Sequence, residues 1–244
     1  MQRFARPLPM AVVVVVALVL CSPRSTGAAP NHPSATNVRA VQPLLALNRR
    51  TFARTGPSAD AAPIRLVSAR TALTRSPTVL PVIREATGPA GALWLRVRLP
   101  TRPNGSTGWV RASVGSITST KWEIAVHRAQ RTAFVLGDGK VRARFRVVVG
   151  KPSTPTPLGT FFVVEKLRLA PGVTEGPWTL TTSAHSNVLR KFDGGTGRVA
   201  LHGTTGMSAP LGTFASHGCV RFAPAAISWI AYHVDAGTPV VITP

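Results

Sequence analysis

Short apolar runs separated by turn-forming residues dominate the chain beyond residue 63. Between residues 93 and 99, leucine or valine at every second position alternates with tryptophan or arginine, which is typical of a strand with one buried face. The Asn104-Gly105 pair predicts a tight turn, and Trp109-Val110 begins the next strand. The pattern therefore predicts a β-hairpin in this part of the chain.

The alternation continues in a larger second part of the chain. Strands are expected at 123–127, 132–136 and 142–149, with the Gly137-Asp138-Gly139 turn before the last, and again in the segments TPTPLGTFFVVEKL and RVALHG. One helix is expected from about residue 222 to 234, because Pro224 suits a first helical turn and Gly237 follows the end. The loop-rich stretch 167–197 is a candidate lid. The predicted fold class is mainly β with one helix.

The first 62 residues have a different character. A basic head with Arg3 and Arg6, an apolar run at 10–20 and a small-residue exit predict a secretory signal peptide at 1–29. A permanent anchor and a lipoprotein acylated at Cys21 are less favoured alternatives. Residues 30–62 are rich in Pro, Ala and Arg and are expected to form a linker. The protein is therefore expected to be exported.

Charge narrows the possible partners. Lys and Arg total 29 against 8 Asp and Glu, a formal net charge of +21, while 44% hydrophobic residues predict a packed core and exclude wholesale disorder. Such a charge first suggests nucleic acid. Because an exported protein instead meets anionic wall polymers, no nucleic-acid partner is expected. A purely solubilising role for the charge is the alternative.

The densest chemistry lies between residues 201 and 222. Only two cysteines occur, and removal of the signal peptide leaves Cys219 alone, 17 positions after His202. A thiol is a strong nucleophile when it ionises, and a nearby imidazole can hold its proton. Backbone N–H groups around Gly218 and Cys219 can bind an oxyanion, and Arg221 can hold a carboxylate. This set of groups suits acyl transfer.

The segment HGT…LGTFASHGCVRF resembles the signature of L,D-transpeptidases with a YkuD catalytic domain. In that signature a histidine is followed, after a spacer, by Ser or Thr, then His-Gly-Cys, one further residue, and Asn or Arg. The upstream segments TPTPLGTFFV and GPWTL agree with the family pattern, so the resemblance spans the domain expected at 119–244. It implies a YkuD-type β-sandwich or barrel. His185 departs from the family pattern, where tyrosine is common.

The resemblance assigns roles residue by residue. Cys219 corresponds to the nucleophile and His202 to the general base. The Gly203 carbonyl would orient the imidazole, and His217 would support the site. The expected substrate-binding residues are Arg221, Ser216, Gly218 and Thr204. A zinc site formed by His202, His217 and Cys219 is disfavoured, because two ligands at i and i+2 in a turn suit a tetrahedral metal poorly.

Residues 63–118 resemble a bacterial SH3-like module, through WLRVRLP and the following Gly-Trp strand. The alternative for this segment is a plain β-cap on the next domain.

The family resemblance implies an exported peptidoglycan L,D-transpeptidase without metal or cofactor. Its cysteine would attack a tetrapeptide stem, release D-Ala and pass the acyl group to a diaminopimelate amine, which makes 3→3 cross-links. The implied partners are peptidoglycan stem peptides and, as covalent inhibitors, carbapenem β-lactams. An L,D-carboxypeptidase and a non-catalytic wall-binding protein remain alternatives.

Overall fold

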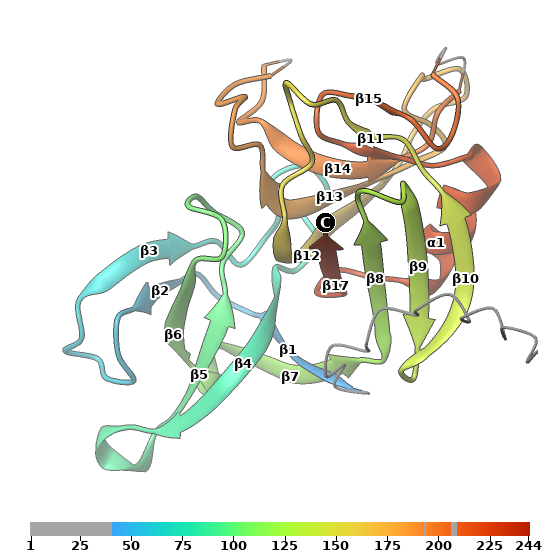
Figure 1. Cartoon of the computed structure of the whole chain (residues 1–244). Helices are drawn as coiled ribbons and strands as arrows, with labels where there is room; N and C mark the ends of the chain where they lie inside the picture. Colours follow the sequence, from blue (N-terminus) through green and yellow to red (C-terminus); the bar gives the residue numbers. More distant parts are fainter. Residues whose placement is uncertain (1–40, 193, 206–208) are drawn as a thin grey trace, which may run out of the picture. The chain divides into compact units, whose positions relative to one another are not determined.

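The computed structural model describes residues 41–192, 194–205 and 209–244. The expected signal peptide and the first part of the expected linker lie outside these residues and stay predictions. The described chain forms a seven-stranded sheet, an eight-stranded sheet and a two-stranded sheet, which confirms the predicted mainly-β class (Figure 1). Within the described residues, no helix has the length and apolar character that a membrane crossing requires.

The N-terminal sheet has the strand order β3-β2-β6-β5-β4-β1-β7, and its strands pair antiparallel. Its elements are β1 (Gln42–Leu47), β2 (Thr51–Arg54), β3 (Pro63–Val67), β4 (Val79–Thr87), β5 (Leu93–Arg98), β6 (Thr107–Arg111) and β7 (Gly115–Thr120), with the 3-10 helices η1 (Pro89–Gly91) and η2 (Ala112–Val114). The predicted hairpin is β5–β6, and Leu95 and Val97 are fully buried in it. Its SH3-like character stays a prediction.

The linker expected at 30–62 is wrong from residue 42 onward. β1 lies between β4 and β7 in the sheet, and Leu44, Leu45 and Leu47 are buried in its core. β2 pairs with β3 and β6. The Pro- and Arg-rich composition concealed this short apolar run, because its burial depends on partners 33 to 78 residues away along the chain.

The C-terminal sheet has the order β10-β9-β8-β17-β12-β13-β14-β16. Its strands are β8 (Trp122–His127), β9 (Thr132–Gly137), β10 (Lys140–Arg146), β12 (Gly159–Arg168), β13 (Trp178–His185), β14 (Arg198–His202), β16 (Val220–Arg221) and β17 (Pro239–Thr243); β11 (Val149–Gly150) and β15 (Phe214–Ser216) pair separately. The strands expected at 123–127 and 132–136 are confirmed. The strand expected at 142–149 is interrupted, since β10 ends at Arg146. β13 is an interior strand, so the stretch 167–197 as a whole is not a lid.

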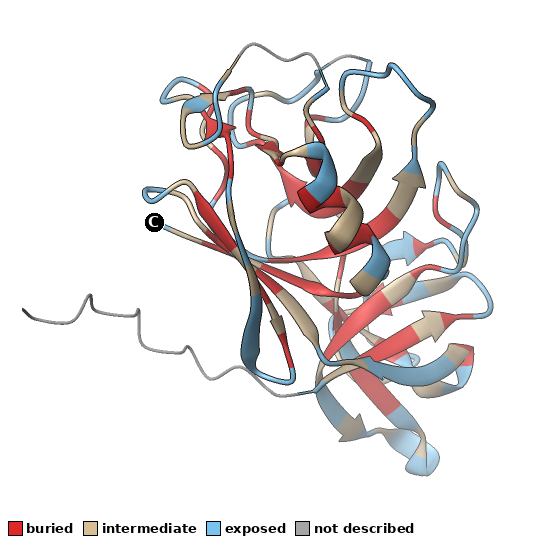
Figure 2. Ribbon diagram, turned by 90° about the vertical axis from the view of Figure 1, so that its right-hand side faces the viewer, coloured by how far each residue is buried: buried red, intermediate tan, exposed pale blue. Residues whose placement is uncertain are grey.

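The predicted helix is confirmed as α1 (Pro224–His233), with its proline in the first turn. Ala226, Ile227, Ile230 and Ala231 form its buried face. They join the core cluster that contains Leu180, Leu201 and Val220 from the sheet. Figure 2 shows this buried side of α1 facing the sheet. The helix therefore covers the face of β13, β14 and β16 that is opposite to their polar face.

Strand β12 contributes to two cores because side chains alternate along a strand. Phe161 and Val163 belong to the core under α1, whereas Phe162 and Val164 belong to the core of the N-terminal sheet. The loop between β5 and β6 adds polar contacts to the C-terminal part. Asn104 donates to the His185 carbonyl (2.8 Å) and accepts from the His185 N–H (2.9 Å). The N-terminal sheet is thus packed against β12 and tied to the end of β13.

Candidate active site

The predicted chemical residues gather on one face of the C-terminal sheet. Thr181 is paired with Ala200, and Thr179 with His202, across β13 and β14. In the parallel pair β14–β16, His202 is paired with Arg221, which places Cys219 beside Ala200. The Ala200 N–H donates to Cys219 Sγ at 3.4 Å. Cys219, directly before β16, therefore lies diagonally across from His202 on β14.

A tight turn from Ser216 to Cys219 presents the thiol. Ser216 is buried, and its hydroxyl donates to the Cys219 carbonyl and accepts from the Gly218 N–H (3.1 Å). Gly218 has φ of +121°, a left-handed conformation that disfavours any side chain. Ser216 therefore closes the turn instead of facing substrate. The Gly218 N–H that the sequence suggested for an oxyanion is already engaged, whereas no acceptor within the described residues pairs with the Cys219 N–H.

The threonine-proline loop at 154–157 holds this turn through hydrogen bonds. Thr156 Oγ1 donates to the Gly218 carbonyl (2.9 Å) and accepts from the Gly150 N–H (2.9 Å). Thr154 Oγ1 donates to the Ser216 carbonyl (3.3 Å). Both hydroxyls are buried, so the TPTP segment serves to fix the backbone on which Cys219 sits.

His202 is held in one tautomer. Its Nδ1 lies 2.7 Å from the Gly203 carbonyl oxygen, which can only accept a hydrogen bond, so Nδ1 carries the proton and Nε2 has the free lone pair. The ring is only 5% exposed. A Cβ on Gly203 would overlap the Gly176 carbonyl oxygen. The close approach that positions the Gly203 carbonyl thus depends on glycine.

Burial pushes the two reactive groups toward their neutral forms. Burial raises the pKa of the Cys219 thiol, against the opposing effects of the Ala200 N–H and Arg221. Burial lowers the pKa of His202, and Arg221 lowers it further, while the Gly203 hydrogen bond and Glu175 oppose this. Both shifts favour the thiol and the neutral imidazole over the ionised pair that the sequence suggested. This arrangement requires proton transfer to accompany attack by sulfur.

Two charged side chains act on both groups. Arg221 is half-buried, and its Nε is buried without a hydrogen-bond partner among the described residues. Glu175 lies in the loop before β13, where its carbonyl accepts the Gly203 N–H (3.0 Å). It influences the pKa of both Cys219 and His202. Sequence reasoning missed Glu175, because a single acid in a loop gives no signal until the fold brings it beside β14.

Two other predicted residues lie at the edge of the site. His217 is exposed, and its ring packs on Phe192 with centroids 5.1 Å apart, a position that fits a supporting role better than proton transfer to Cys219. Thr204 is half-buried, and the neighbouring Thr205 ties the loop to the Thr174 carbonyl (2.9 Å). Across the described part of the chain, no three His, Cys, Asp or Glu side chains gather to hold a metal ion.

One family model and several solved structures are similar to this chain. The sequence model of the L,D-transpeptidase catalytic domain family (YkuD) matches residues 121–242. An L,D-transpeptidase from Mycobacterium smegmatis is 19% identical, with 68% of this chain and 99% of that one covered and a TM-score of 0.41. The catalytic domain of the E. faecium enzyme is 26% identical, with 50% and 96% covered and a TM-score of 0.38.

A third solved structure is L,D-transpeptidase 3 from Mycobacterium tuberculosis with a faropenem-derived adduct, which is 16% identical, with 82% of each chain covered and a TM-score of 0.43. No curated protein matches the chain. The family match, which spans half of the 244 residues and contains both His202 and Cys219, decides the assignment. The chain belongs to the L,D-transpeptidase family, and residues 121–242 are its YkuD catalytic domain.

Proposed function

We propose that this protein is an exported enzyme that joins peptidoglycan stem peptides by L,D-transpeptidation, with Cys219 as nucleophile and His202 as general base. The observation that carries the proposal is the placement of the Cys219 thiol diagonally across from an imidazole whose Nδ1 is committed to the Gly203 carbonyl. Family membership supports the reaction class. The basic charge of the chain and the expected signal peptide support a location at an anionic wall.

The first half-reaction acylates the enzyme. As Cys219 Sγ attacks the carbonyl carbon that links residues three and four of the donor stem, its proton passes to His202 Nε2. The Cys219 N–H donates to the oxyanion, in the manner of an oxyanion hole. When the C–N bond breaks, His202 returns the proton to the departing D-Ala amine, and a thioester remains.

The second half-reaction transfers the acyl group. The side-chain amine of an acceptor stem attacks the thioester carbon and loses its proton to His202. The C–S bond breaks, and the proton on His202 returns to Cys219 Sγ as the 3→3 amide forms. Because both half-reactions pass through one base, a neutral His202 is required at the start of each. The lowered pKa of His202 keeps it neutral at physiological pH.

Intact-mass measurement with a carbapenem tests the nucleophile. Wild-type protein is expected to gain one carbapenem mass, located on the peptide that contains Cys219, and the Cys219→Ala variant none. The His202→Gln variant is expected to acylate at least 100-fold more slowly, because general-base catalysis contributes factors of about 10² to 10⁴. An adduct on the Cys219→Ala variant would refute the assignment.

Product analysis separates transfer from hydrolysis. Wild-type protein is incubated with a donor tetrapeptide and a labelled acceptor stem. A joined peptide and free D-Ala are expected. Tripeptide and D-Ala without any joined peptide would instead identify an L,D-carboxypeptidase. If no D-Ala is released from the donor, only the wall-binding alternative remains.

A further inference from the structure

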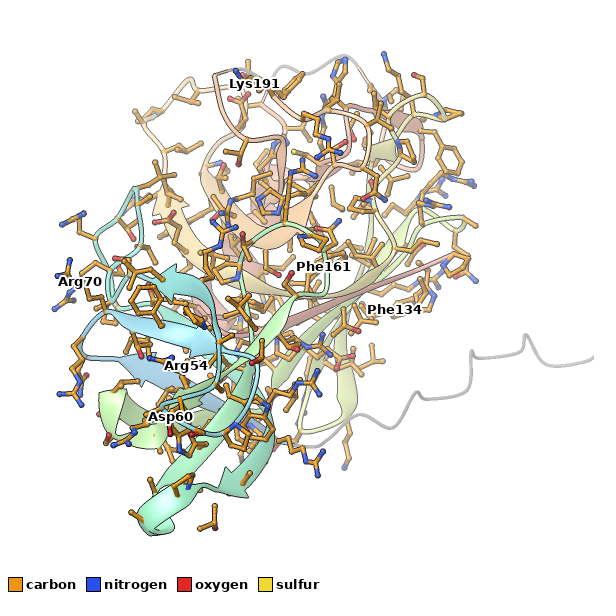
Figure 3. The ribbon with its side chains drawn as sticks, turned by 90° about the vertical axis from the view of Figure 1, so that its left-hand side faces the viewer. Arg54, Asp60, Arg70, Phe134, Phe161 and Lys191 are labelled. Atoms are coloured by element: carbon orange, nitrogen blue, oxygen red, sulfur yellow. The ribbon has the colours of Figure 1, made fainter. Side chains whose placement is uncertain are left out.

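A cavity of about 640 Å³ lies between the N-terminal sheet and the polar face of β12, β13 and β14. Its walls come from the loop after β3 and from the segment after β5; apolar lining residues are Leu66, Val67, Leu73, Leu99, Pro100 and Val164. Arg70 also lines it and is seen in Figure 3 at the outer edge of this region. The cavity is large enough for the end of a peptide side chain together with water.

Glu165 forms the acidic part of the floor and is only 6% exposed. Its Oε2 accepts three hydrogen bonds, from the N–H groups of Leu73 (3.2 Å) and Thr74 (2.9 Å) and from Thr74 Oγ1 (3.0 Å). No donor within the described residues pairs with its second oxygen, Oε1. A buried carboxylate with one oxygen fixed and the other free can accept hydrogen bonds from a cation.

Thr181 lies next to Glu165 on the floor, since the two residues are paired across β12 and β13. It is only 9% exposed, yet its Oγ1 has no hydrogen-bond partner in the described part of the chain. Most buried hydroxyls in proteins are paired, and an unpaired one is costly. A ligand donor beside Glu165 would satisfy both the hydroxyl and the free carboxylate oxygen.

Arg198 supplies the opposite charge. Two of its N–H groups donate to the carbonyls of Thr182 (3.0 Å) and Pro100 (3.4 Å), which leaves three donors of the guanidinium free. Arg198 and Glu165 interact electrostatically, but none of the ion pairs within 4.0 Å among the described residues joins them. The cavity therefore holds a buried carboxylate and a half-buried guanidinium apart, which suits a ligand that carries both signs.

A row of neighbouring residues leads from the floor toward the nucleophile. Glu165, Thr181 and Ala200 are paired across three strands, and Cys219 lies beside Ala200, directly before β16. With strands about 4.8 Å apart, Thr181 lies about 9.6 Å from Cys219 along this row. The four carbon–carbon bonds of a diaminopimelate side chain span roughly 5 Å. The bond to the reacting carbonyl carbon and one hydrogen bond to the ammonium account for the rest of the distance between Thr181 and Cys219.

We propose that this cavity binds the free end of the diamino acid at position three of the donor stem, with its ammonium on Glu165 and Thr181 and its carboxylate on Arg198. The inference rests on the proposed function and names a specificity pocket for it. The acceptor stem is less suitable than the donor stem as the ligand of this cavity, because its attacking amine must lie about 3 to 3.5 Å from the thioester carbon. A cation held at Thr181 is too far away to attack.

Three donor tetrapeptides test the proposal. They differ only at residue three, which carries an ammonium and a carboxylate, an acetylated amine and a carboxylate, or an ammonium alone (lysine). The readout is the rate of D-Ala release divided by the concentration of protein that forms a carbapenem adduct. Unfolded protein forms no adduct and is thereby left out of the rate. Wild-type protein is expected to prefer the first peptide over each of the others by about 10- to 100-fold, the range for a charged hydrogen bond.

Two variants locate this preference. Thr181→Val removes a hydroxyl without a protein partner and is expected to fold normally, and Glu165→Gln removes the charge. Glu165→Gln is expected to reduce the preference for the ammonium over the acetylated peptide to threefold or less. Thr181→Val is expected to reduce it by about 2- to 10-fold, the contribution of one neutral hydrogen bond. The exposed-residue control Glu85→Gln keeps it. Equal rates for the three peptides in wild-type protein, or an unchanged preference in both variants, would overturn the cavity assignment alone. D-Ala release from none of the peptides would overturn the proposed function, and the pocket with it.

Discussion

The Cys219 end and the Glu165 end of one sheet face differ in how their polar groups are desolvated and paired. At the Cys219 end, burial without a counter-charge in contact drives thiol and imidazole toward neutral forms. At the Glu165 end, the carboxylate is buried, and three donors hold one of its oxygens. The comparison shows that depth alone does not describe a buried polar group, because the donors that neighbouring segments supply differ between the two ends.

The two ends also differ in which segments build them. The reactive end consists of β14, β16 and their adjoining turns, within the YkuD domain. The cavity end is closed by loops of the N-terminal sheet, through Leu73, Thr74 and Pro100. The chemistry is therefore internal to the catalytic domain, whereas the proposed specificity pocket requires the preceding sheet.

The largest effect should come from breaking the reactive end at Gly203. In Gly203→Ala, the new Cβ collides with the Gly176 carbonyl, so the backbone that orients His202 must shift. Carbapenem acylation is expected to fall by about 100-fold per folded protein, the cost of misplacing a catalytic group by about 1 Å. Gly56→Ala is the control, because its Cβ would meet no atom closer than 3.5 Å. Wild-type acylation in Gly203→Ala would contradict the role of this close approach.

An effect of intermediate size is expected in the pH dependence of stability, through His185 at the end of β13. Burial, with Arg198 and Arg102, lowers the pKa of His185 to about 4. Because its pKa in the unfolded chain is about 6.5, the unfolded state binds more protons between these values, and stability present above pH 6.5 is lost as the pH falls toward 4. The free energy of unfolding is expected to drop by up to about 3 kcal/mol from this group.

Denaturant unfolding at pH 7 and pH 4 measures this loss. His185→Gln should reduce the drop, whereas His217→Gln, which changes an exposed histidine, should keep the wild-type drop. Identical drops in wild type and His185→Gln would show that His185 is not held neutral in the folded protein.

The smallest effect sharpens the electrostatics of the reactive end. Since the pKa of His202 is lowered, carbapenem acylation should keep its full rate below pH 6.5 and fall only as the pH approaches the lowered value. Arg221 contributes to that lowering, so Arg221→Gln is expected to move the acid limb to higher pH. Arg84→Gln, an exposed change in the N-terminal sheet, should leave the limb in place. An unmoved limb in Arg221→Gln would remove Arg221 from the electrostatics of His202.

Local patterns in the sequence were sufficient for much of the fold. Period-two alternation located β5, β8 and β9, the Asn104-Gly105 pair located the hairpin, and Pro224 located the start of α1. Alternation fails where a strand is short or lies in biased composition. β1 and β13 were therefore missed, since the partners that bury them are distant in the chain.

The sequence by itself was sufficient to predict the proposed reactive pair, because His202 and the Ser216-His217-Gly218-Cys219 turn resemble the family signature in residue types and spacing. Only the tertiary structure decided their protonation, the engagement of the Gly218 N–H, and the approach of Glu175 and Arg221. Only it placed Glu165, Thr181 and Cys219 in one row. The physical reason is that desolvation and cross-strand register depend on segments far apart in the chain, such as residues 165 and 219, which are 54 positions apart, and no local pattern encodes such contacts.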